Sequence, residues 1–190
     1  MAVTKLRIEL EPTPGYHETP QEPYNIWGVL SLVLLKDNER ETLFELENTW
    51  YFDLANFKEW FLECYEDILT EPMLIQGMSM LPSESLAQAH ARLIDREFPE
   101  EQEEEMFEFD SALYNYRRKH NLRFGLPGVT MPAIYIGLNH GSGEVSVFNE
   151  DEQWAYQINL EDFCTDLRQK LEQLEVFKIG ESKVPERRIW

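Results

Sequence analysis

The amino-acid sequence predicts an α+β protein with a mainly antiparallel sheet. Two hairpin-helix (β-β-α) units build the sheet, the helices lie on one face, and a helical acidic insertion separates the units. Three observations indicate this: alternating apolar residues mark strands in both halves, helical spacing follows each set, and a Glu-rich stretch lies between. With 190 residues, 43% of them hydrophobic, we expect one domain over residues 1–190.

Three strands are expected in the first fifty residues. Residues 3–10 alternate between apolar and charged side chains, and a proline-bearing loop over 12–24 follows. The apolar run 25–35 predicts a strand that is buried on much of both faces. A polar turn at 36–40 leads into a returning strand over 41–51, so the two strands form a hairpin.

Two amphipathic helices with one common spacing are expected to follow the hairpins. The first runs from 54 to 70 with Asp53 as a candidate N-cap, and the last runs from 159 to 177 with Asn159 as its cap. Their apolar faces match at a shift of 106 residues: Leu54, Phe57, Phe61, Tyr65 and Ile68 against Leu160, Phe163, Leu167, Leu171 and Leu174. The match favours a repeated unit, and the alternative is that any two amphipathic helices share this spacing.

The insertion covers residues 72–131 and is expected to be mostly helix and loop. One helix begins near Pro82 and ends near Phe98. Residues 100–120 read as another helix, acidic at its start and basic at its end, although 106–109 also fits a short strand.

The second half of the chain predicts another antiparallel set. Its strands are expected at 133–138, 144–148 and 154–158, with a Gly-bearing turn at 139–143 between the first two. Residues 181–190 are expected to form a mobile tail.

Charge is the strongest compositional signal. The chain has 17 Lys and Arg against 36 Asp and Glu, a net charge of −19, and residues 1–110 hold 7 basic and 25 acidic side chains. Binding to nucleic acid or to anionic lipid is disfavoured, because both need clustered basic residues. The charge instead favours a basic protein partner.

The acidic residues concentrate in one segment, Asp95–Asp110, which holds nine acids and one base. We predict a partner-binding strip here, in which carboxylates meet Lys and Arg while aromatic residues anchor the partner. The alternative is a solvated helix start. The predicted residues are Asp95, Glu97, Glu100, Glu101, Glu103, Glu104, Glu105, Phe107, Glu108, Phe109 and Asp110.

A basic segment directly follows this strip. Residues 114–120 combine tyrosines with Arg117, Arg118, Lys119 and His120, and Arg123 comes next. Stacking on single-stranded nucleic acid needs such residues, but five cationic positions are few in so acidic a chain. We therefore expect them to pair with the acidic strip and neutralise it internally.

Catalytic and cofactor motifs are not recognisable in the sequence. It has no GxxxxGK[ST] or GxGxxG, and its four histidines form no HxH, HxxxH or HExxH pair. We expect no catalytic residue, no metal and no cofactor. Cys64 and Cys164 fall on helical apolar faces, which predicts buried free thiols. The N-terminus lacks an apolar signal region and no run approaches a membrane span, so a cytoplasmic protein is expected.

Four segments give the chain a resemblance to small bacterial immunity-type proteins of toxin–immunity and defence systems. They are Phe57–Phe61, His120–Phe124, Pro132–Gly137 and Trp154–Phe163. Such proteins are commonly single acidic α+β domains, and the resemblance implies that this chain binds and neutralises a basic effector. It assigns no functional residue.

The expected function is therefore that of a non-enzymatic acidic protein that binds a basic partner, as an immunity protein or inhibitor. Two alternatives remain open. One is a metal-dependent enzyme or effector subunit acting on nucleic acid through converging carboxylates. The other is a structural subunit of a larger assembly.

Overall fold

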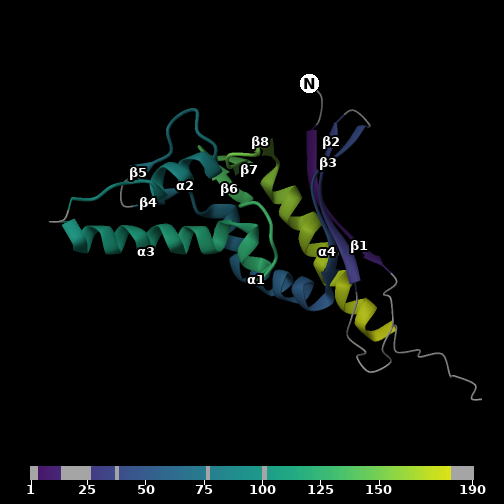
Figure 1. Cartoon of the computed structure of the whole chain (residues 1–190). Helices are drawn as coiled ribbons and strands as arrows, with labels where there is room; N and C mark the ends of the chain where they lie inside the picture. Colours follow the sequence, from purple (N-terminus) through teal and green to yellow (C-terminus); the bar gives the residue numbers. More distant parts are fainter. Residues whose placement is uncertain (1–3, 14–26, 37–38, 76–77, 100–101, 181–190) are drawn as a thin grey trace, which may run out of the picture.

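The computed structural model describes residues 4–13, 27–36, 39–75, 78–99 and 102–180. Within them the protein is α+β, with two three-stranded antiparallel sheets and four α-helices (Figure 1). The predicted tail 181–190, Glu100, Glu101 and most of the loop 12–24 lie outside the described residues. The prediction of one sheet made from two hairpin-helix units differs from the structure, because each set of strands forms a separate sheet.

The first sheet has the order β1-β2-β3, formed by β1 (Thr4–Thr13), β2 (Trp27–Lys36) and β3 (Glu39–Trp50). The expected β2–β3 hairpin is present, and β1 adds a third antiparallel strand along β2. Leu32 and Val33 point to opposite faces of β2 yet are 1% and 0% exposed, so the central strand is buried on both faces as predicted.

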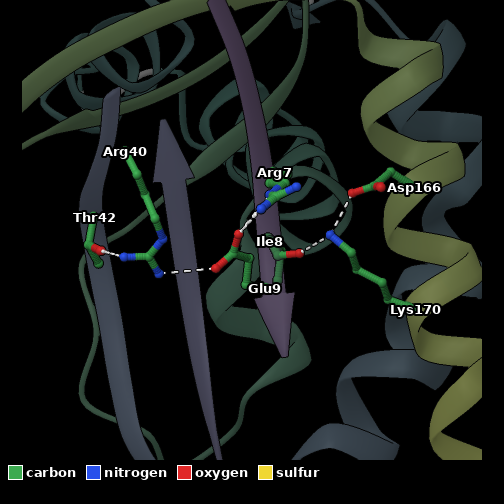
Figure 2. A network of polar contacts seen from close by, with 7 residues as sticks. All are labelled: Arg7, Ile8, Glu9, Arg40, Thr42, Asp166 and Lys170. Carbon is green, nitrogen blue, oxygen red and sulfur yellow. Dashed lines mark hydrogen bonds and ion pairs between the residues drawn. The ribbon is translucent and has the colours of Figure 1, made fainter. Parts of the chain in front are cut away.

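A network of polar contacts lies on the first sheet and reaches α4 (Figure 2). Glu9 on β1 accepts hydrogen bonds from Arg7 of the same strand and from Arg40 on β3, and Arg40 also donates to Thr42. Burial opposes ionisation of Glu9, but the hydrogen bonds from Arg40 and Arg7 hold its pKa below the usual value. On the same sheet, Lys170 of α4 donates to the Ile8 carbonyl at 2.6 Å.

The second sheet has the order β6-β7-β8, formed by β6 (Tyr135–Asn139), β7 (Ser142–Phe148) and β8 (Gln153–Ile158). These strands match the predicted positions closely. His140 and Gly141 turn the chain between β6 and β7 with positive φ values of 48° and 82°. Such a two-residue turn suits a hairpin, because both central positions of its favoured type need positive φ.

Helices α1 (Tyr51–Thr70) and α4 (Leu160–Gly180) share one core with both sheets. Phe57 and Phe61 of α1 and Leu167 of α4 are at most 1% exposed. The start of α1 differs from the prediction, since the chain passes directly from β3 into the helix at Tyr51. Asp53 therefore lies inside the first turn and does not precede the helix.

The insertion contains β4 (Leu74–Ile75), β5 (Met78–Ser79), α2 (Leu86–Ile94), α3 (Glu103–His120) and the 3₁₀ turn η2 (Leu122–Gly125). Its helices α2 and α3 form a second, smaller core. Segment 100–120 is thus helical from Glu103 onward, and 106–109 is not a strand. Leu93 of α2, Phe109 of α3 and Tyr135 of β6 pack together in this core.

Helices cover both faces of the second sheet, which differs from the predicted one-sided arrangement. Val145 and Val147 of β7 face the core shared with α1 and α4, while Glu144 and Ser146 alternate with them and face α2. Glu144 Oε1 accepts from the Leu86 N–H at 2.7 Å, and Ser146 Oγ accepts from the Ala87 N–H at 3.1 Å. These polar positions on β7 therefore supply acceptors for the first turn of α2.

Candidate functional site

The acidic strip, defined as the predicted partner-binding residues from Asp95 to Asp110, lies on the end of α2 and the first half of α3. This half of α3 extends away from the two sheets (Figure 1). Glu100 and Glu101 lie outside the described residues. The remaining acids of the strip are all exposed: Asp95, Glu97, Glu103, Glu104, Glu105, Glu108 and Asp110.

The helix itself favours acids at this end. Glu103, Glu104 and Glu105 occupy the first turn of α3, and the side chain of the N-cap residue Gln102 makes no capping hydrogen bond. The unpaired N–H groups at a helix start carry partial positive charge, which stabilises nearby carboxylates. Local structure thus tolerates this dense charge without requiring a salt bridge.

The two aromatic residues of the strip have opposite placements. Phe107 is 73% exposed, whereas Phe109 is 1% exposed and lies 5.2 Å from the Phe98 ring, centroid to centroid. Two positions apart on a helix means about 200° around the axis, so the two rings cannot share a face. Phe107, with Met106 at 38% exposure, supplies the apolar surface of the strip.

The basic second half of α3 pairs with α1 and not with the acidic strip, in contrast to the sequence-based expectation. Arg118 contacts Glu63 at 3.3 Å, and Lys119 contacts Asp67 at 3.2 Å and Glu71 at 2.9 Å. The helix is about 27 Å long, so its basic end cannot reach carboxylates at its start.

Further contacts fix this basic end to α1. Trp60 Nε1 donates to the Arg118 carbonyl at 2.8 Å. The hydrogen bond to Glu71 is the main cause that raises the pKa of Lys119. Among the described residues, by contrast, no ion pair joins Glu103, Glu104, Glu105, Glu108 or Asp110 to a base. These five carboxylates are therefore exposed, with no ion pair among the described residues.

Four buried polar side chains form a layer where α2, α3 and β6 meet: His90, Tyr116, His120 and Tyr135. His120 is 0% exposed, stacks on Tyr116 with ring centres 4.0 Å apart, and its Nδ1 lies 2.9 Å from the Ile136 carbonyl oxygen. Burial is the main cause that lowers the pKa of His120, and burial also raises the pKa of Tyr116. Nδ1–H therefore donates to the carbonyl when the imidazole is neutral.

A glycine makes room for this layer. A Cβ at Gly137 of β6 would lie 2.7 Å from His120 Nδ1, closer than side-chain atoms pack. The sequence shows no paired motif for its histidines and places His120 in the basic segment, so this layer was not predicted. The available signal was Gly137 inside a predicted strand, since such a glycine often marks a close approach.

The described residues offer no other clear chemistry. Within their ranges, no group of three or more His, Cys, Asp or Glu is placed to hold a metal ion. Cys64 and Cys164 are free and buried as predicted, and burial raises the pKa of their thiols to about 11 and about 12. Both stay protonated at neutral pH, so neither is an activated nucleophile. None of the described helices has the length and apolar character needed to span a bilayer.

Comparisons with known proteins add no family. No family model matches the chain, and neither a curated protein nor a solved structure is significantly similar to it.

Proposed function

We propose that this chain is a non-enzymatic binding protein that docks a basic protein partner through the acidic strip, as an inhibitor or immunity protein does. One observation carries the proposal: the described strip acids are exposed, and within the described residues none is paired with a base. The acids whose carboxylates are engaged elsewhere, such as Glu9 and Glu71, hold the fold together.

The physics of such a surface suits fast capture of a basic partner. The field of grouped carboxylates extends about 8 Å at physiological salt and accelerates encounter. Exposed Phe107 and Met106 then offer apolar contact that slows dissociation. The partner should carry Lys or Arg around an apolar pocket. The two free thiols support a cytoplasmic setting, because reducing compartments preserve them.

The proposal is tested by comparing two triple variants with the same change in net charge. The strip variant is Glu103→Lys, Glu104→Lys, Glu105→Lys. The control is Glu150→Lys, Asp151→Lys, Glu161→Lys, at exposed acids outside the strip. We expect the wild type and the control to retain the same basic protein from a source-cell extract, and the strip variant to lose it. The association rate with that protein should fall about tenfold in the strip variant and less in the control.

Salt dependence supplies a second readout. Raising ionic strength from about 20 mM to about 300 mM should slow wild-type association strongly, and the strip variant weakly. Equal retention and equal salt dependence in the two triple variants would contradict a role for the strip. Circular dichroism of each variant checks that its total helix content equals that of the wild type.

A further inference from the structure

His90 stands in the middle of α2, in the polar layer between the helices and the second sheet. It is 4% exposed, its ring centre lies 4.7 Å from that of Tyr135, and its Nε2 has no hydrogen-bond partner. The imidazole is thus enclosed by α2, α3 and β6, and no described residue is hydrogen-bonded to its Nε2.

Burial and one neighbouring charge, the Arg117 guanidinium of α3, oppose a positive charge on His90. Tyr116 of α3 and Tyr135 of β6 are neutral phenols of the same layer, and the Tyr135 ring packs against the imidazole. Glu144 of β7 is the acid on this face, but its carboxylate already accepts from Leu86 N–H and Asn139 Nδ2. On α2 itself, Arg92 is paired with Glu84. Burial first, and Arg117 second, lower the pKa of His90 to about 4.

Burial lowers the pKa of His120 as well, but at this other end of the layer Glu71 and Asp67 act in the opposite direction. Its Nε2 lies 3.6 Å from Glu71 Oε2, and Asp67 and Lys119 complete the charges around it. A proton added to His120 finds a carboxylate next to it, whereas a proton added to His90 meets a guanidinium. The two histidines should therefore respond differently to acid.

We propose that His90 makes the contact of α2 and α3 with the second sheet an acid-sensitive latch. Protonation of His90 separates α2 and the acidic half of α3 from β6, while the basic end of α3 stays attached to α1 through Trp60, Lys119 and His120. The latch needs no partner, so it stands apart from the proposed function.

Linkage between protonation of His90 and opening of the layer sets the direction and size of the pH effect. The pKa of His90 falls from 6.5 to about 4 on burial, so the stabilisation is complete above pH 6.5 and is lost as pH falls toward 4. Between pH 7.5 and pH 5, the equilibrium constant for keeping the layer closed decreases about 30-fold from this group alone.

Amide hydrogen exchange, corrected for intrinsic rates, tests the latch at pH 7.5 and pH 5. Protection in α2 and in the 107–111 segment of α3 should fall about 30-fold in the wild type, with little change in α1 and α4. His90→Phe keeps a ring against Tyr135 and carries no proton, so it should abolish the acid response. His140→Asn, at an exposed turn histidine, should leave the response as in the wild type.

A ring-proton titration of His90 in the wild type gives an independent readout if the variant folds poorly. We expect its midpoint well below 6.5, with loss of α2 protection tracking the titration. Three results would overturn the latch: a His90 midpoint near 6.5, an equal acid response in His90→Phe, or simultaneous loss of protection in α1 and α4.

Discussion

The two halves of α3 carry opposite charges and are held in opposite ways. The first half presents Glu103, Glu104 and Glu105 to solvent, whereas Arg118 and Lys119 in the second half pair with acids of α1. Both charge types sit at the helix end that the dipole favours, so local structure treats them alike. The difference arises because α1 brings Glu63 and Asp67 beside the basic end, whereas the nearby Arg96 lies over the Phe98 and Phe109 rings.

Whether a run of charged residues forms ion pairs within the fold or stays exposed to solvent therefore depends on the element packed beside it. The density of charge in the run does not decide this. The nine-acid segment looked the more distinctive in sequence, yet the basic end makes most of the described ion pairs of α3. Three pairs of substitutions test this comparison.

The largest effect is expected from Phe109→Ala measured beside Phe107→Ala. The first removes a ring that is 1% exposed and should lower the free energy of unfolding by about 3–5 kcal/mol. The second trims a ring that is 73% exposed and should change stability by less than about 0.5 kcal/mol. Chemical denaturation of both variants checks this. Similar losses would mean that the outer face of the acidic half is packed.

A smaller loss of stability is expected from Gly137→Ala, at the β6 position that faces His120 in the basic half of α3. The added methyl group would lie 2.7 Å from His120 Nδ1. The ring is stacked on Tyr116 and bonded to the Ile136 carbonyl, and Gly137 itself has a φ of 159°. Overpacking together with backbone strain should therefore cost about 1–3 kcal/mol. Gly128→Ala is not a suitable control, since its φ of 84° adds backbone strain. Thermal melts measure this loss of stability. Ser111→Ala, at an exposed α3 position, is the control and should be close to neutral.

The smallest effect contrasts removal of one charge from each half. Lys119→Met loses contacts with Asp67 and Glu71 and should destabilise by about 1 kcal/mol, a modest value because the pair is partly solvated. Glu108→Gln removes an exposed, unpaired acid among like charges and should be neutral or slightly stabilising. Urea titrations at low salt measure both changes. A greater loss for Glu108→Gln than for Lys119→Met would reverse the assignment of the two halves.

Periodicity predicted the elements well because burial on one face leaves a local signature. The β2–β3 hairpin, the strands of the second sheet and the long helices all appear close to their expected residues. The helix over α3 also followed from its charge order. Strand-to-strand assignment is not local, so the division into two sheets and the position of α2 on the second sheet were not predictable.

The candidate site was only partly readable for the same reason. Exposure of the strip acids agrees with their density, but Phe107 and Phe109 looked equivalent until the helix fixed which ring faces inward. The ion pairs of Arg118 and Lys119 depend on α1, about fifty residues away in sequence. His90 and His120 carried no motif, because their environment comes from three elements that meet only in the fold.

The bond from Lys170 to the Ile8 carbonyl affects how the edge of the first sheet could pair with another strand. In the described residues β1 pairs on one side only, with β2, which leaves its outer rim of peptide groups as a template for another chain. The ammonium of Lys170, itself held by Asp166 at 2.7 Å, occupies one acceptor of that rim. At this position an incoming strand would have to displace the charged side chain of Lys170 before it could pair with β1.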